Sequence, residues 1–252
     1  MKQPIPLPCE DRDGKTIPEE QPGQEWVAVR DSLARIVAAA AHELIGPFNQ
    51  VSSLLALFAK RHGGEAGEEA EVLLALVESA AVRMQATVSG LRTWFDVAGA
   101  NLLRIPVDME RTLGVAMYLL EAEIKRTGAA ISSDGLPAVC GDPDRLTELF
   151  TILIGNSLKF QRPGVAPQIR VAARTSGTTE VFSVSDNGTG FDPACRNQLF
   201  LPFKKLNGHK MPGAGLGLAV ARMIVDLHHG SIWIESQPGE GATVSFALSA
   251  AP

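Results

Sequence analysis

Asp186-Asn187-Gly188-Thr189-Gly190 and Gly213-Ala214-Gly215-Leu216-Gly217 are two glycine clusters that stand in this order near the C-terminus. A carboxylate before a tight glycine turn can accept a hydrogen bond from the polar edge of a ring. A glycine run that opens a helix can bind phosphate through its backbone N–H groups. Together the two clusters predict a nucleotide pocket in the second half of the chain.

A predicted helix upstream of these clusters carries further polar groups. Asp142 can cap a helix from Pro143 to about Phe160, with the proline at its first position. Asn156 and Lys159 lie one turn apart and share a face of this helix, where an amide and a lysine can hold a metal ion and a phosphate oxygen. Asp186 ends an apolar strand, and a carboxylate buried there needs a partner, for which the adenine amino group is a suitable donor.

The second part of the chain, roughly Leu103 to Ser249, has the pattern of an α/β sandwich. A loop-rich stretch, Phe191 to Pro212, precedes the last helix. The order of the predicted elements indicates mostly antiparallel strands with helices on one face. Strands are predicted near Arg104–Val107, Ala129–Ser132, Ala138–Cys140, Gln168–Arg174, Val181–Ser185, Ser231–Ser236 and Ala242–Leu248, and helices over Met109–Thr127, Pro143–Phe160 and Ala214–Leu227.

The first part of the chain follows the spacing of packed helices. Two apolar seams with alternating steps of three and four residues predict an antiparallel helical hairpin. Two helices alone would leave much of the seam exposed, so we expect two hairpins to pair as a four-helix bundle in a homodimer. The seams are Leu33, Val37, Ala40, Leu44, Pro47, Val51, Leu54 and Phe58, then Leu73, Val77, Ala80, Met84, Thr87, Leu91 and Trp94, separated by Gly63, Gly64 and Gly67.

His42 lies on the face of the first helix that points away from the bundle. A neutral imidazole is a nucleophile near pH 7, and Glu43 beside it can hydrogen-bond the ring or take its proton. Polar residues on this face are also what any soluble bundle carries, so the histidine alone leaves both interpretations open. His228 and His229 are predicted at a helix end, with favourable contacts to the helix dipole.

Composition sets broad limits. The chain has 252 residues, 45% of them apolar, and a formal net charge of -5, which argues against a nucleic-acid partner. No apolar window reaches the length of a membrane span, and a proline-rich start without a secretory signal predicts a flexible tail over 1–25. We expect a cytoplasmic α+β protein with a helical dimerisation domain over 26–98 and a nucleotide-binding domain over 103–250.

From about Val27 to Leu248 the chain resembles the bacterial two-component sensor histidine kinases. The run His42 to Phe48 resembles their phosphoacceptor box, and Pro47–Gln50 with Phe203–Leu206 leans toward the phytochrome-type members. The other ordered motifs are Asn156–Phe160 for the N box, Asp186–Gly190 for the first glycine box, Leu199–Phe203 for the F box, Gly213–Gly217 for the second glycine box and Gly239–Thr243 for the closing turn.

The resemblance implies ATP and Mg²⁺ as ligands. It implies that Asp186 binds the adenine amino group, that Asn156 holds Mg²⁺, and that Lys159 neutralises phosphate charge. A lid over Leu199–Leu206 would add Lys204 and Lys205. The N–H groups of Gly215 to Leu218 would cradle the triphosphate, and the implied nucleotide-binding set also includes Gly188, Gly190, Gly213, Gly215, Leu216, Gly217, Leu218 and Thr243.

The implied reaction is autophosphorylation of His42, assisted by Glu43, followed by transfer to an aspartate of a response regulator. A separate sensor protein is a further implied partner. Ile45 and Gly46 depart from the usual phosphoacceptor box and imply weak phosphatase activity. Ala214 removes a hydroxyl from the second glycine box and implies modest ATP affinity.

Two alternatives remain open. A phosphotransfer or scaffold protein that has lost ATP use would keep the bundle, but such proteins usually lose the glycine boxes, which persist here. A pure ATPase would have no use for His42. Related ATPases carry a water-activating glutamate where this chain has Ile152.

Overall fold

The computed structural model of the protein describes residues 49, 51–53, 55, 56, 60, 68–202, 204 and 215–251. The described part confirms a mixed α+β domain after a long helix. The elements are α2 (Glu68–Ala98), β1 (Ile105–Asp108), α3 (Met109–Leu119), α4 (Glu121–Thr127), β2 (Ala130–Ser133), β3 (Ala138–Gly141), α5 (Pro143–Lys159), β4 (Gln168–Ser176), β5 (Thr179–Asp186), the 3₁₀ helix η1 (Pro193–Gln198), α6 (Gly217–Leu227), β6 (Ser231–Gln237) and β7 (Gly241–Ser249).

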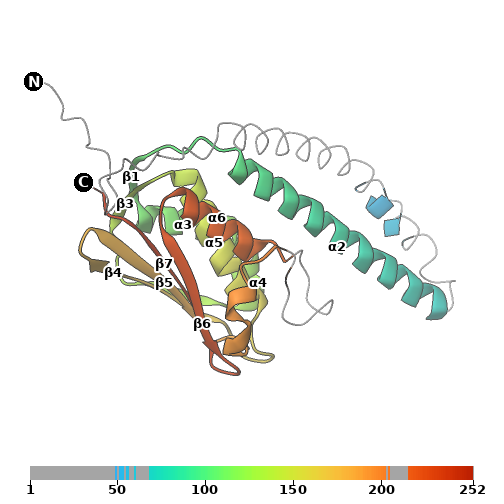
Figure 1. The fold of residues 1–252 in the computed structure, drawn as a ribbon. Helices are drawn as coiled ribbons and strands as arrows, with labels where there is room; N and C mark the ends of the chain where they lie inside the picture. Colours follow the sequence, from blue (N-terminus) through green and yellow to red (C-terminus); the bar gives the residue numbers. More distant parts are fainter. Residues whose placement is uncertain are drawn as a thin grey trace, which may run out of the picture.

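The main sheet has the strand order β2-β4-β5-β7-β6. β2 pairs with β4 in parallel, and the other neighbours pair antiparallel. β1 and β3 form a separate small antiparallel sheet. Helices α3, α5 and α6 cover one face of the main sheet (Figure 1), which confirms the predicted layering.

The core lies between this sheet and the helices. Phe182 and Phe246 stack with ring centroids 5.0 Å apart, and Phe150 of α5 meets Phe246 edge-on at 5.9 Å. All three side chains are fully buried. Because side chains alternate along β5, Phe182 and Val184 face the core, and Asp186 follows on the same face at the end of the strand.

Two predicted helix boundaries are wrong. The helix expected over Met109–Thr127 breaks at Leu120, which lets both Leu120 and Ile124 pack against the core. The last helix begins at Gly217 instead of Ala214, because Gly215 has a positive φ of 75° that a right-handed helix cannot contain. The loop-rich stretch after Phe191 contains η1, which the sequence did not predict.

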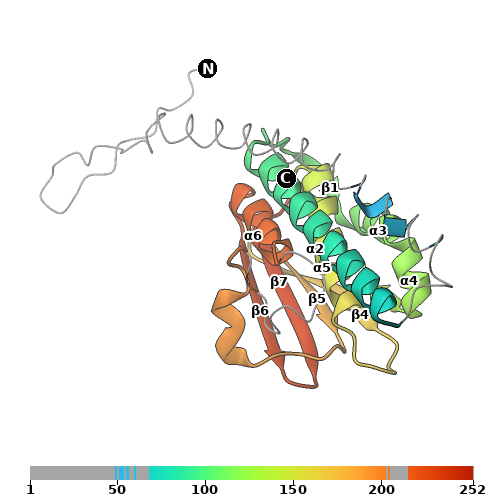
Figure 2. The same cartoon turned by 90° about the vertical axis from the view of Figure 1, so that its right-hand side faces the viewer.

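The second predicted hairpin helix is present as α2, whereas most of the first helix lies outside the described residues. α2 runs past the mixed domain, and its C-terminal end packs beside α6 (Figure 2). Val97 is fully buried there, and Trp94 packs against the same core. Farther up the helix Val77 and Met84 are 41% and 55% exposed, so part of the predicted seam has no cover within the described chain.

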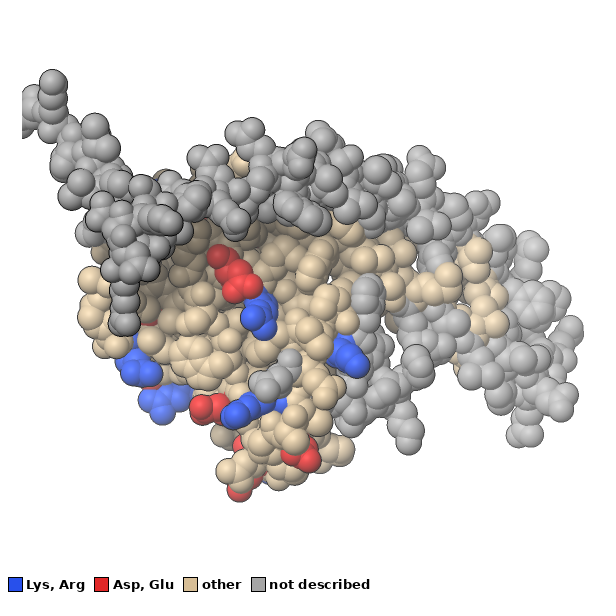
Figure 3. All heavy atoms as spheres, in the orientation of Figure 1, with Lys and Arg blue, Asp and Glu red and all other residues tan. Residues whose placement is uncertain are grey.

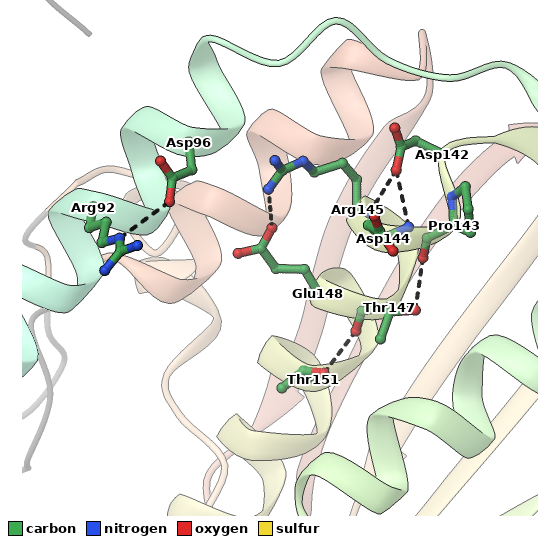
Figure 4. Close-up of polar contacts among 9 residues, drawn as sticks. All are labelled: Arg92, Asp96, Asp142, Pro143, Asp144, Arg145, Thr147, Glu148 and Thr151. Atoms are coloured by element: carbon green, nitrogen blue, oxygen red, sulfur yellow. Dashed lines mark hydrogen bonds and ion pairs between the residues drawn. The ribbon is translucent and has the colours of Figure 1, made fainter. Parts of the chain in front are cut away.

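α2 and α5 each carry an ion pair between side chains of the same helix (Figure 4). Arg145 Nη1 lies 2.9 Å from Glu148 Oε2, and Arg92 Nε lies 3.7 Å from Asp96 Oδ2. Burial raises the pKa of Glu148, an effect that Arg145 offsets and the negative charge of Asp96 reinforces. Charged groups of both signs also lie close together on the face shown in Figure 3.

Asp142 links the segment between α2 and β1 to α5, and it caps α5 as the sequence predicted. Its Oδ1 accepts from the backbone N–H groups of Asp144 and Arg145, and its Oδ2 accepts from the N–H of Leu103. The N–H of Asp142 in turn donates to Nε2 of His228, at 3.0 Å. Nδ1 of His228 lies 2.7 Å from the carbonyl oxygen of Ile224, so the ring sits neutral between two helices.

The neutral state of His228 predicts a loss of stability in mild acid. Burial lowers the pKa of this buried imidazole below its ordinary 6.5, so the unfolded chain binds a proton that the folded chain does not. Stability should therefore fall as the pH drops through 6.5 toward the lowered pKa. Urea unfolding at about pH 7.5 and about pH 5.5 measures this difference.

His228→Gln provides the control for this prediction. Glu148 has a raised pKa and acts with the opposite sign, because the folded chain keeps its proton to higher pH than the unfolded chain does. Comparison of the wild type with the variant separates the contribution of His228 from that of the other titrating groups. The loss of stability between the two pH values should be smaller in His228→Gln than in the wild type. An unchanged loss would show that His228 does not carry it.

Candidate functional site

Asn156 lies where α5 meets the start of α6. A Cβ added at Gly217 would sit 3.8 Å from Asn156 Nδ2, 3.9 Å from its Oδ1 and 3.4 Å from Cγ2 of Ile152. The Asn156 side chain is half-buried and makes no hydrogen bond to another described residue. The structure therefore brings the predicted N box against the predicted second glycine box, with an amide available for a ligand.

The first turn of α6 has the features of an anion-binding helix end. Leu216 is its N-cap residue and supplies no side-chain hydrogen bond, and the first turn carries no acidic residue. Gly215, at φ 75°, turns the chain into the helix. The first N–H groups, including those of Gly217 and Leu218, need a partner from outside the helix. Gly213 lies outside the described residues.

Asp186 stands at the end of β5 in a half-buried position. Its Oδ1 accepts from the N–H of Gly188 at 2.8 Å and of Ala242 at 3.2 Å. Its Oδ2 accepts from the hydroxyl of Ser157 at 2.9 Å. Ser157 is the residue after Asn156, so a single helix contacts both ends of the predicted pocket. Sequence reasoning missed this serine because a hydroxyl in a helix carries no signal of its own.

The glycines of the first cluster serve close backbone packing. Gly190 has φ 60°, and a Cβ there would lie 1.9 Å from the carbonyl oxygen of Gln237. A Cβ on Gly188 would lie 2.6 Å from the carbonyl oxygen of Phe160, which also accepts from the N–H of Thr189. Both glycines are thus needed to seat the Asp186 loop between α5 and the β6–β7 turn.

Two polar side chains that the sequence did not single out brace this loop. Arg162 donates from Nε to the carbonyl of Asn187 at 2.7 Å and from Nη1 to that of Gly239 at 3.2 Å. Ser236 accepts from the N–H of Phe191 and donates to the carbonyl of Gly241. Their partners are all backbone groups, which is why residue type alone did not reveal them.

Thr243 lies beside the carboxylate on the neighbouring strand. Its hydroxyl donates to Oγ of Ser185 at 2.9 Å, and these two residues are cross-strand partners. Because Ala242 donates to Asp186, the start of β7 adjoins the carboxylate. The predicted closing turn therefore meets the first glycine box in space.

The predicted lysines fall at different places. Nζ of Lys159 lies 4.8 Å from the ring centroid of Phe160, so the ammonium group sits over an aromatic face. Lys204 is exposed. Leu199 and Phe200, at the start of the predicted lid, are buried against Ile234 and anchor it. Lys205, His42 and Glu43 lie outside the described residues.

Metal ligands are sparse in the described part of the chain. No cluster of three or more His, Cys, Asp or Glu side chains suited to a metal ion occurs among residues 68–202 and 215–251 and the shorter described stretches. Asn156 offers an amide oxygen, a ligand type that Mg²⁺ accepts, and Mg²⁺ commonly takes its remaining ligands from phosphates and water. In the same part of the chain, no helix combines the length and the apolar character needed to span a bilayer.

The chain is similar to known proteins over most of its length. Residues 141–252 match the family described as histidine kinase-, DNA gyrase B- and HSP90-like ATPases. Cyanobacterial phytochrome A of Nostoc sp. is 33% identical over 217 residues, covering 86% of this chain and 28% of the relative. The sensor histidine kinase ZraS of Escherichia coli (strain K12) is 31% identical over 220 residues, covering 86% of this chain and 45% of the relative.

A solved structure shares the fold. The crystal structure of full-length ShkA in complex with AMPPNP has a TM-score of 0.63 and 24% identity, covering 86% of this chain and 46% of that one. The chain spans less than half the length of ZraS and of the phytochrome. Residues 141–252 therefore form a domain of this ATPase family, and over 86% of its length the chain is similar to sensor histidine kinases.

Proposed function

We propose that the protein is an ATP-dependent kinase that phosphorylates its own His42 and passes the phosphoryl group to an aspartate of a response regulator. One observation carries the proposal. α5 places Asn156 against the open first turn of α6 and places Ser157, the next residue, against Asp186. Three motifs that are far apart in sequence are therefore brought together by one helix.

The pocket residues have distinct roles toward ATP. Oδ2 of Asp186 faces the adenine amino group, since Oδ1 is already occupied by two backbone donors. The N–H groups from Gly215 to Leu218 bind phosphate oxygens, and Thr243 supports the adenine end from β7. Lys159 and the lid residues Lys204 and Lys205 neutralise phosphate charge, while Gly188, Gly190 and Gly213 shape the loops.

Asn156 is the residue of this chain that would hold Mg²⁺. Bound there together with phosphate oxygens, the ion supplies neutralisation of the triphosphate charge. The half-buried amide of Asn156, which lies against the start of α6, supports this assignment. Ile152 packs at the start of α6, where an apolar side chain gives no general base to a water molecule. This favours transfer to a protein group over hydrolysis.

His42 acts as the nucleophile in the proposed reaction. Its ring nitrogen forms a bond to the γ-phosphorus as the bond to the ADP oxygen breaks, and Glu43 takes the ring proton. The product is a phosphoramidate, which can transfer its phosphoryl group to a carboxylate. Catalysis is then mainly a matter of positioning and of charge stabilisation.

The organisation of the chain belongs to the same proposal. We assign 26–98 to dimerisation and phosphotransfer, 103–250 to ATP binding, and 1–25 to a tail. The exposed apolar residues Val77 and Met84 on α2 support pairing with a second copy in a four-helix bundle. Because the substrate is ATP, we place the protein in the cytoplasm, where a separate sensor protein would supply the stimulus.

Labelling with γ-labelled ATP and Mg²⁺ tests the proposal. The wild-type protein should acquire label that is stable in base and labile in acid, and His42→Ala should lose essentially all of it. His62→Ala is the matched control, since it removes another histidine of the predicted hairpin, and it should keep the label. Nucleotide binding without any label would instead support a scaffold that has lost catalysis.

A further inference from the structure

Ser157 is a buried polar residue that the proposed reaction does not use directly. It lies on α5 at 5% exposure, and its hydroxyl has two acceptors in reach: Oδ2 of Asp186 at 2.9 Å and the carbonyl oxygen of Leu153 at 3.3 Å. A hydroxyl has a single hydrogen. The shorter contact to a charged acceptor is the stronger one, so the hydrogen points to Asp186.

The two oxygens of Asp186 differ in what they can still accept. Oδ1 receives two backbone N–H groups, from Gly188 and Ala242. Among the described residues, Oδ2 receives only Ser157. Oδ2 is therefore the oxygen that can still accept a hydrogen bond from a ligand. Because the Ser157 hydroxyl occupies one lone pair of Oδ2, it fixes the direction of the lone pair that remains.

From this geometry we infer that Ser157 is a positioning residue for recognition of the 6-amino group of a purine. By occupying one lone-pair direction of Oδ2, it aims the remaining one at the nucleobase. The carboxylate has no hydrogen to donate. In a base with a carbonyl at position 6, the carbonyl oxygen would therefore face Oδ2 of Asp186 without a hydrogen bond between them. The inference rests on the proposed function, because it takes the pocket around Asp186 to be the nucleotide site.

The placement of Ser157 on α5 links this recognition to the phosphate end. Asn156, its neighbour, faces the start of α6, and the helix turns about 100° between successive residues, so the two side chains point to different parts of the pocket. The N-box helix thereby sets the distance between the base and the phosphates. A change at Ser157 should loosen the base end alone.

Ser157→Ala tests the inference by calorimetric titration with Mg²⁺ and two nucleotides, ATP and inosine triphosphate. Alanine favours the helix, so the variant should fold. The affinity for ATP should fall by about tenfold, the affinity for inosine triphosphate should stay within about twofold, and the preference for ATP should shrink accordingly. In labelling assays the KM for ATP should rise by about the same factor while kcat at saturating ATP stays unchanged.

Two further variants sharpen the test. Ser157→Cys keeps a weak donor at the site and should retain part of the preference. Ser183→Ala, on β5, removes a hydroxyl that contacts a backbone carbonyl at 3.5 Å and should change neither affinity nor preference. If Ser157→Ala binds both nucleotides as the wild type does, the inference is overturned while the proposed function stands. If the wild type binds neither nucleotide, the proposed function itself fails.

Discussion

Asp186→Asn should lower the affinity for ATP by about 100-fold and leave the fold intact. The asparagine oxygen can take the place of Oδ1 and accept from Gly188 and Ala242. The amide nitrogen then replaces Oδ2, and it can donate to the Ser157 hydroxyl, so no internal group loses its partner. Toward the nucleotide, however, a donor now faces the adenine amino donor.

Calorimetric titration with Mg²⁺-ATP measures this effect, and thermal unfolding checks the fold. Asp192→Asn is the matched control, because Asp192 is an exposed carboxylate that caps η1 by accepting from Ala194. That variant should bind ATP as the wild type does. If Asp186→Asn binds ATP with wild-type affinity, the Asp186 carboxylate does not take part in nucleotide binding.

Gly241→Ala should destabilise the protein by about 3 kcal/mol and also weaken ATP binding. Gly241 has φ 90°, and an added Cβ would lie 1.9 Å from the carbonyl oxygen of Asp186. Backbone strain and steric overlap therefore add, and relieving the overlap must move Asp186, the residue that we propose binds adenine. Urea unfolding gives the stability, and the same titration gives the affinity.

Gly239→Ala is an internal control in the same turn. Gly239 has a similar φ of 82°, but no atom lies within 4 Å of a Cβ added there. The substitution therefore introduces backbone strain but no steric overlap. This variant should cost about 1 kcal/mol and keep normal ATP affinity. Equal effects of the two substitutions would mean that packing against Asp186 is not what Gly241 provides.

Local sequence signals predicted the fold well where short-range physics decides it. The capping role of Asp142, with Pro143 after it, depends on neighbouring residues, and the structure shows both. Strand alternation places Phe182 and Val184 on the core face for the same reason. The break at Leu120 was missed, because a helix pattern does not reveal that two apolar side chains must reach one core.

The candidate site was only partly predictable. The sequence was enough to select Asn156, Asp186 and the start of α6, because the binding chemistry of an amide, a carboxylate and a glycine turn can be inferred from residue type. Ser157, Arg162 and Ser236 could not, since they act through partners that lie far away in sequence. His228 was expected at a helix end, and it is there, but burial makes it a neutral bridge to Asp142.

The sequence by itself determined which residues of this protein are candidates for ligand binding and which segments form most of the described helices and strands, since both depend on residue type and local spacing. Only the tertiary structure decided how the groups share their hydrogen bonds: one carboxylate oxygen of Asp186 accepts from two backbone N–H groups, and the other accepts from a serine of α5. Such assignments arise from contacts across dozens of residues, and no local pattern encodes which partner a buried donor will find.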